Sequence, residues 1–243
     1  LGGRNGESDV KMILEYTCKA PTVDENNLGQ TLIVIIPNTS DYGGICYMYD
    51  DGCAIAYCPK SDYGYPLDFR GVIQHEAGGH GFGKLGDEYI YHNAFIDACP
   101  CICCPHAEAI VSAHAKGWYQ NLSLSGKMNE VPWSHLIFHD KYKQIVDIFE
   151  GAFMHTRGVY RSEQNSCMNN DIPYYSTISR ESIVKRIKEI AGEPYTFEEF
   201  VANDVMDAST VNITRSMVPE FFSKGSIYQH APIMMGKRPK LNN

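Results

Sequence analysis

The chain has 243 residues, 44% of them hydrophobic, and a formal net charge of −8 at pH 7. This length and composition predict one globular domain with a substantial core, while the negative charge argues against nucleic acid and anionic membrane surfaces as partners. The longest aliphatic run, residues 32–36, is too short to span a bilayer.

The first quarter of the chain predicts a sheet. Residues 10–17 alternate in polarity, residues 31–36 form an apolar run that ends at Pro37, and residues 53–57 form another apolar run. Alternation and short apolar runs bounded by turn residues are typical of strands. We therefore expect three strands, the second buried and the third at the edge of the sheet beside the helix that follows.

That helix is predicted to begin after Asp68. Aspartate is a good N-cap residue, and Phe69, Val72 and Ile73 give the segment one apolar face. The helix runs directly into residues 75–80, so the residues with the clearest chemistry lie at its end.

Residues 75–80 read HEAGGH, and they predict a metal site. Neutral imidazoles are the commonest zinc ligands, and an adjacent carboxylate can accept a proton from water on the metal. We expect His75 and His80 to bind Zn²⁺ and Glu76 to act as the catalytic base.

The spacing of the two histidines is unusual, because they lie five residues apart rather than four. A regular helix turns about 100° per residue, so five steps leave the rings about 140° apart and unable to share one ion. One extra residue absorbed as a π-turn restores the phase, and Gly78 and Gly79 lower the cost of that distortion. The sequence therefore predicts a π-turn between His75 and His80.

Two further segments carry a family resemblance. Residues 80–89 (HGFGKLGDEY) and residues 158–170 (GVYRSEQNSCMNN) resemble two blocks of the bacterial IgA-peptidase family of zinc metallopeptidases. Within the second block, residues 166–168 (SCM) are similar to the Met-turn of metzincins, where a methionine packs beneath the metal ligands. The resemblance covers roughly residues 31–190. The extra residue between the histidines departs from the metzincin pattern, although dipeptidyl-peptidase III is a zinc family with the same spacing.

The resemblance implies a third metal ligand after the second histidine. Metzincins place a histidine or aspartate six residues further on, and that position here is Gly86. Asp87 and Glu88 follow. We expect Asp87 to be the ligand, because its shorter side chain suits a tight return, with Glu88 bonding a histidine or capping the loop. Glu88 as the ligand, and a solvated loop with no metal, are the alternatives.

The expected ligand count sets the mechanism. Three protein ligands leave a fourth position for water, whose pKa zinc lowers towards about 7. Glu76 would take a proton from this zinc-activated water and pass it to the leaving amine. The astacin-type metzincins have a tyrosine two residues after the Met-turn methionine, where this chain has Asn170. The oxyanion donor is therefore unassigned, and the nearby candidates are Arg157, Tyr160, Tyr174 and Tyr175.

The remaining half of the chain predicts mostly helices. We expect a helix over residues 107–116, a short strand over residues 146–149, and a helix from Ser179 to Ala191. Thr196 and Glu199 form the pattern of a capping box that opens another helix. Beyond Val205 the chain is irregular and basic, and we interpret it as a surface extension. The other histidines are expected at the surface or in packing.

Nine cysteines leave at least one thiol unpaired in an oxidising setting. The cluster at residues 99–104 predicts disulfides or buried thiols, with a second metal site as the alternative. A disulfide between Cys53 and Cys58 would close a hairpin-like loop. Cys167 is expected to fill space in the core.

Together these features predict an α+β protein with a metzincin-like zincin catalytic domain. The upper half would hold a twisted mixed sheet and the active-site helix, and the lower half would be more irregular and helical, with the Met-turn. We expect this domain over residues 1–205 and a C-terminal extension over residues 206–243.

The expected function is a zinc endopeptidase acting on peptide or protein substrates; the alternative is a non-catalytic, zinc-stabilised module that binds protein or glycan. The family suggests a secreted or cell-envelope protein, and a start at Leu1 without an export signal suggests a trimmed or partial chain.

Overall fold

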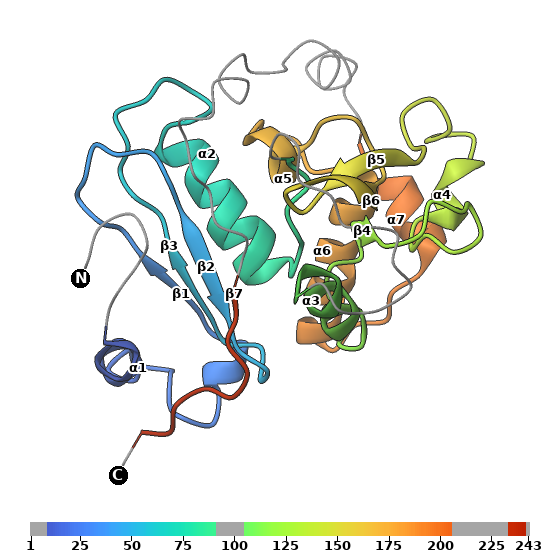
Figure 1. The fold of residues 1–243 in the computed structure, drawn as a ribbon. Helices are drawn as coiled ribbons and strands as arrows, with labels where there is room; N and C mark the ends of the chain where they lie inside the picture. The colour runs from blue at the N-terminus through green and yellow to red at the C-terminus, as the bar shows by residue number, and fades with distance from the viewer. Residues whose placement is uncertain (1–8, 91–104, 206–232, 242–243) are drawn as a thin grey trace. The chain divides into compact units, whose positions relative to one another are not determined.

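The computed structural model describes residues 9–90, 105–205 and 233–241. It confirms an α+β structure with a mixed sheet (Figure 1). Two compact units divide between Phe82 and Gly83, and residues 233–241 belong to the first unit. Among the described helices, none combines the length and the apolar character that crossing a membrane demands.

The first unit is built on a four-stranded sheet. Its strands are β1 (Leu32–Ile35), β2 (Ile45–Met48), β3 (Ala54–Tyr57) and β7 (Ile233–Met234), in the order β1-β3-β2-β7. β3 pairs in parallel with β1 and antiparallel with β2, and β7 runs parallel to β2. The prediction of a strand near residues 53–57 is confirmed, but its position at the sheet edge is wrong. All four residues of β3 are buried, as expected for a strand with neighbours on both sides.

Residues 10–17 form a helix, α1 (Val10–Thr17), and the predicted strand there is wrong. The same apolar residues also fit a helical spacing, since Val10, Ile13 and Leu14 lie at i, i+3 and i+4. The side chain of Asp9 caps the helix by accepting a hydrogen bond from the backbone N–H of Met12 at 3.1 Å. Capping and a helical apolar face therefore outweigh the approximate alternation.

One face of the sheet packs on α1 and on the short helix η1 (Leu28–Gln30). The buried members of this cluster are Leu14, Leu28, Ile45, Tyr49, Cys53, Ile55 and Tyr57. Because side chains alternate along a strand, Ala54 and Ala56 of β3 point to the opposite face. The small alanines leave room for a helix to approach closely on that side.

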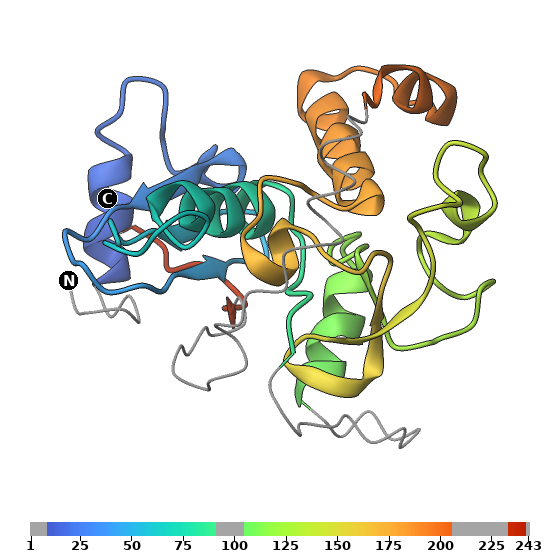
Figure 2. The same ribbon diagram turned by 90° about the horizontal axis from the view of Figure 1, so that it is seen from above.

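The helix on that opposite side carries the histidines. α2 (Phe69–Ile73) begins as predicted at Asp68, whose carboxylate accepts a hydrogen bond from the N–H of Arg70 at 3.0 Å. It continues without a break as η2 (Gln74–Phe82), a π-helix that contacts β1, β2 and β3. Figures 1 and 2 show this continuous helix running along the strands.

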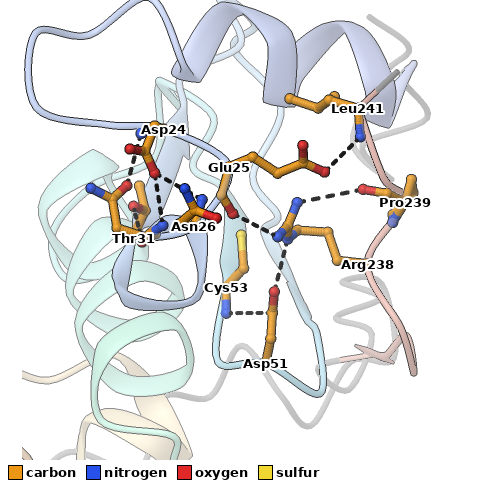
Figure 3. Close-up of polar contacts among 10 residues, drawn as sticks. Asp24, Glu25, Asn26, Thr31, Asp51, Cys53, Arg238, Pro239 and Leu241 are labelled. Atoms are coloured by element: carbon orange, nitrogen blue, oxygen red, sulfur yellow. Dashed lines mark hydrogen bonds and ion pairs between the residues drawn. The ribbon is translucent and has the colours of Figure 1, made fainter. Parts of the chain in front are cut away.

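The C-terminal residues are tied to the first unit by side-chain and backbone bonds (Figure 3). The Arg238 guanidinium bonds Asp51 at 2.8 Å and the backbone carbonyl of Glu25 at 3.3 Å. The N–H of Leu241 donates to the Glu25 carboxylate at 3.0 Å. Together with β7, these bonds make residues 233–241 part of the sheet layer. Residues 206–232, the rest of the predicted extension, lie outside the described residues.

The second unit combines a small sheet with helices. Its strands β4 (Leu122–Ser123), β5 (Phe149–Ala152) and β6 (His155–Arg161) form an antiparallel sheet in the order β4-β6-β5. Its helices are α3 (Pro105–His114), α4 (Ser134–Ile137), α5 (Cys167–Asn170), α6 (Thr177–Ala191) and α7 (Phe197–Asn203). A buried cluster forms the core: Val131, Trp133, Leu136, Ile137, Tyr142, Val146, Ile178 and Phe200.

The predicted elements of this unit exist, with shifted boundaries. The helix that ends at Ala191 begins at Thr177, so its N-cap is Ser176 and the prediction of Ser179 is wrong. Ser179 lies inside the first turn, where its hydroxyl bonds that of Ser176 at 2.8 Å. The predicted cap at Thr196 is confirmed, because its hydroxyl accepts the N–H of Glu199 at 3.2 Å. The strand predicted over residues 146–149 begins only at Phe149.

The cysteine predictions can be compared with the structure in part. Cys53 and Cys58 are both buried thiols, so the predicted loop closure between them is wrong. Cys167 is fully buried, as expected of a residue that fills space in the core. The cluster at residues 99–104 lies outside the described residues.

Candidate metal centre

His75 and His80 face each other on the π-helix η2. Their Nε2 atoms are 3.1 Å apart and their ring centroids 4.8 Å apart. A π-helix links residue i to residue i+5, so side chains five positions apart come to the same side. The predicted π-turn is confirmed, and it extends over nine residues rather than one turn. The local backbone therefore brings together two rings that a regular α-helix would separate.

Asp87 completes a group of three possible ligands. One ligand atom from each of His75, His80 and Asp87 lies within 4.8 Å of the others, and all three residues are buried. Two donors of a tetrahedral zinc site with bonds of ~2.1 Å are about 3.4 Å apart, close to the separation of the two imidazole nitrogens. Two imidazoles and a carboxylate are ligands that divalent transition metals accept. This group could hold a metal ion.

Backbone hydrogen bonds hold the segment around Asp87 in place. The carbonyl of Asp87 accepts the N–H of Phe153 at 3.0 Å, and the N–H of Glu88 donates to the carbonyl of Met168 at 2.7 Å. The side chain of Asn121 bonds both the N–H and the carbonyl of Gly86, at 2.9 and 2.8 Å. The carboxylate of Asp87 thus projects from a backbone whose neighbours on both sides are anchored.

Glu88 serves a different purpose from Asp87. Its carboxylate accepts hydrogen bonds from Ser166 at 2.5 Å, from Asn121 at 2.9 Å and from Ser176 at 3.4 Å. Burial raises the pKa of Glu88 to about 7, although the bonds from Ser166 and Asn121 oppose the rise. Of the two roles predicted for Glu88, its contacts fit the one that anchors the loop.

Glu76 is buried beside the histidines, and its position is limited by a glycine that precedes β2. A methyl group added at Gly44 would lie 2.5 Å from the Oε1 atom of Glu76, so only glycine leaves room for this carboxylate. Cys58, which follows β3, is also close. Burial raises the pKa of the Cys58 thiol, Glu76 adds to the rise and His75 opposes it. A buried carboxylate therefore directly follows the candidate ligand His75 in the helix.

The chain matches no protein-family model and no curated protein. The likeness to the IgA-peptidase family consequently rests on the sequence motifs alone.

The predicted Met-turn and oxyanion candidates lie in the second unit. Met168 is fully buried, and its carbonyl is the group that receives the N–H of Glu88. The hydroxyl of Tyr174 donates to the buried carboxylate of Glu163 at 2.7 Å, and that of Tyr160 lies 3.5 Å from the Glu150 carboxylate. These two tyrosines thus have structural partners, and no oxyanion donor is assigned.

Two neighbours of the site were missed from the sequence. Gly44 could have been suspected, because the pair Gly43-Gly44 stands directly before a strand, where close backbone approach is a usual reason for glycine. Cys58 gave no such signal, since a single cysteine at a strand end is commonly a small core residue. The histidine pair His106 and His155, with ring nitrogens 2.7 Å apart, was expected only as surface or packing residues.

Proposed function

We propose that this protein is a zinc-dependent endopeptidase in which His75, His80 and Asp87 bind the metal and Glu76 is the general base. The observation that carries the proposal is the burial of a carboxylate, Glu76, directly beside a three-ligand group. A purely structural site has no need for a carboxylate at that position. A hydrolytic site needs one to move a proton.

The donor set is compatible with zinc but does not require it. Catalytic zinc is bound by three protein ligands drawn from histidine and carboxylate or cysteine, and one further position stays open. Two histidines and one carboxylate are also the ligands of non-haem iron oxygenases. Glu76 supports zinc, because hydrolysis uses a base beside the metal. Metal analysis of the purified protein distinguishes the two ions.

The roles of the residues follow from their chemistry. When bound, the ion would supply Lewis-acid activation of water and of the scissile carbonyl. The carboxylate of Glu76 would accept a proton from the attacking water and return it to the leaving amine. Gly44 would keep the carboxylate in place, since any larger side chain would meet it. The anchored backbone on either side of Asp87 would keep the third ligand fixed while the substrate changes charge.

Membership of the IgA-peptidase family, a metzincin-like fold and a secreted or cell-envelope location form part of the same proposal. Two observations support them. The π-helix makes the longer spacing of the histidines compatible with a shared ion. The Met168 segment bonds directly to the Asp87–Glu88 segment, which links the two blocks that carry the resemblance.

The experiment is a digest of a mixed peptide library by the wild-type protein and by Glu76→Gln, with and without chelator. We expect cleavage that chelator abolishes and added zinc restores, and a loss of about 10²- to 10⁴-fold in Glu76→Gln. Glu130→Gln, which removes an exposed carboxylate from the second unit, is the matched control and should keep full activity.

Three results would contradict the proposal. Chelator-resistant cleavage, an equally active Glu76→Gln variant, or iron as the bound metal would each exclude the mechanism. Bound zinc without any cleavage by the wild type would favour the non-catalytic binding module instead.

A further inference from the structure

The segment after the π-helix has two adjacent acids, and only one of them lies with the histidines. Among the described residues, Asp87 belongs to the group of possible metal ligands and Glu88 does not. Both acids are 0% exposed, so solvent exposure does not distinguish them. The difference between them has to come from the contacts of the segment.

The side chain of Asn121 uses its whole amide group on this segment. Its Oδ1 atom accepts the N–H of Gly86 at 2.9 Å, and its Nδ2 atom donates to the carbonyl of Gly86 at 2.8 Å and to the carboxylate of Glu88 at 2.9 Å. An amide nitrogen has two N–H donors, so both are occupied. An aspartate at position 121 would have no donor and would face two acceptors.

The backbone of the segment is extended. Asn121 bonds both the N–H and the carbonyl of Gly86, which lie on the same side only in an extended residue. The carbonyls of Asp87 and Tyr89 both accept N–H groups of residues 153–154, at 3.0 and 2.9 Å, as alternate residues of an extended chain do. Successive side chains of an extended chain point to opposite faces. The side chain of Asp87 therefore leaves the segment on the face opposite to that of the next residue.

Two serines also hold Glu88. Ser166 and Ser176 occupy the N-cap positions of α5 and α6, but neither side chain caps its own helix. Their hydroxyls donate to the carboxylate of Glu88 instead, at 2.5 and 3.4 Å. Serine at an N-cap ordinarily stabilises the start of the helix, and both helices lack that bond here. Together with Asn121, the serines give the Glu88 carboxylate three donors within the second unit.

The missing side chain at residue 86 lets the segment reach Asn121. A methyl group added at Gly86 would collide with the Cδ1 atom of Leu122 and would lie 3.2 Å from the Cγ atom of Tyr119. Leu122 is fully buried and belongs to β4, which pairs with β6. The N–H of Tyr119 donates to the carbonyl of Lys84 at 2.8 Å. Asn121 therefore projects from a fixed part of the chain that lies directly against Gly86.

We propose that Asn121 is a positioning residue that selects Asp87, and not Glu88, as the third metal ligand. Its amide holds Gly86 by both backbone groups and Glu88 by the carboxylate, so that the acid between them is the one presented to the two histidines. The inference rests on the proposed function and adds the residue that determines which acid joins the ligand set.

The test measures the zinc affinity of the metal-free protein by competition with a chromogenic chelator. Asn121→Asp keeps the shape of the side chain, removes both donors and adds a charge beside Glu88. It should weaken zinc binding about 10- to 100-fold, the usual effect of losing a partner that orients a ligand. Ser123→Ala is the matched control. Ser123 is buried in the same part of the chain and likewise bonds one residue, Ser125, by both its carbonyl and its N–H, at 2.9 and 3.0 Å. Its loss should leave zinc affinity unchanged.

Removal of each acid tests the selection of the ligand. Asp87→Asn should weaken zinc binding on the order of 100-fold, because it removes a ligand, and Glu88→Gln should weaken it less than about tenfold. In protein that also carries Asn121→Ser, which removes the amide without adding a charge, the two effects should become more nearly equal. The absorption spectrum of bound Co²⁺ reports the ligand set directly. It should change in Asn121→Ser and stay the same in Ser123→Ala.

The outcomes separate the two proposals. If Asn121→Asp does not fold, Asn121→Ser carries the same expected loss of affinity. Unchanged zinc affinity in the Asn121 variants, an equal loss in Ser123→Ala, or a larger effect of Glu88→Gln than of Asp87→Asn would overturn the positioning role, even if the wild type binds zinc and cleaves peptides. Zinc binding that depends on Asn121 without any cleavage by the wild type would refute the peptidase alone. A wild-type protein that binds no zinc would refute both.

Discussion

The helices η2 and α6 use glycine in opposite ways. η2 (Gln74–Phe82) contains Gly78, Gly79 and Gly81 in its interior and is a π-helix, while α6 (Thr177–Ala191) contains none and is a regular α-helix. α6 instead ends at Gly192, whose φ of 68° closes the helix in the left-handed conformation. Glycine thus ends α6, whereas in η2 it allows the π-helical backbone.

The difference shows where each helix obtains its stability. α6 has no interior glycine, so its own sequence favours the helix. The buried cluster around Ile178 and the ion pairs of Glu181 stabilise it further. η2 sacrifices helix propensity, at about 1 kcal/mol for each interior glycine, and relies on packing against the sheet. In return, η2 carries the two facing imidazoles of His75 and His80 and the carboxylate of Glu76.

The largest effect is expected from His80→Ala. Loss of one imidazole leaves two possible ligands, too few for a tight site, so the bound metal should fall from about one equivalent per chain to nearly none. Elemental analysis after dialysis measures it, with His139→Ala as the control. Equal metal content in the two variants would mean that η2 does not hold the ion.

Gly44→Ala is expected to reduce kcat about 10- to 100-fold while the metal stays bound. The added methyl group would lie 2.5 Å from Oε1 of Glu76, so the carboxylate must move, and displacement of a catalytic group by about 1 Å has effects of this size. Steady-state kinetics and metal content are measured together. Gly64→Ala is the control, because a methyl group there meets nothing within 4 Å. An unchanged kcat would exclude a positioning role for Gly44.

Glu181→Gln is expected to change the acid stability of the second unit. Burial alone would raise the pKa of Glu181, but three hydrogen bonds outweigh it and lower the pKa from 4.5 to about 2. The donors are His135, Lys185 and Tyr195. Because the folded pKa is depressed, the stabilisation is complete above about pH 4.5 and is lost as the pH falls towards 2.

Urea unfolding at several pH values tests this expectation. The variant should lose on the order of 2 kcal/mol at pH 7 and should show less pH dependence between pH 4.5 and 2 than the wild type. Glu198→Gln, which removes an exposed carboxylate from the neighbouring helix, should behave like the wild type. If the unfolding free energies of all three proteins coincide at every pH, the ion pairs of α6 contribute nothing.

The smallest effect is expected from Gly192→Ala. The methyl group meets nothing within 4 Å, so the whole cost comes from the left-handed backbone and should be about 1 kcal/mol. The free energy of unfolding in urea measures it. Gly64→Ala, which lacks the positive φ, should change stability much less, and a similar loss in both variants would mean that the left-handed backbone at Gly192 carries no cost.

The sequence was sufficient for features that depend on local chemistry. The cap at Asp68, the cap at Thr196 and the π-turn between the histidines follow from side-chain type and spacing within a few residues, and the structure has all three. The grouping of Asp87 with the histidines was also expected, although the choice over Glu88 rested on side-chain length. The anchors of Glu88, namely Asn121 and Ser166, lie more than thirty residues away and left no trace in the local pattern.

Features that depend on distant partners were not predictable in the same way. The central position of β3 requires β2 and β1 on its two sides, and nothing in residues 54–57 specifies their order. The helix over residues 10–17 was mistaken for a strand because eight residues with a few apolar positions fit both periods.

The strand pairing of β7 has a consequence for biosynthesis. Arg238 and Asp51 are 187 residues apart, yet both belong to the layer that supports η2. A ribosome adding roughly 5 to 20 residues per second needs on the order of 10 to 40 s to cover that interval. During that time β2 has an open edge, which is a hazard for pairing with other chains. The nascent protein therefore has to wait for residues 233–241 before this edge of the sheet is covered, and a chaperone that shields β2 would have its greatest value in that interval.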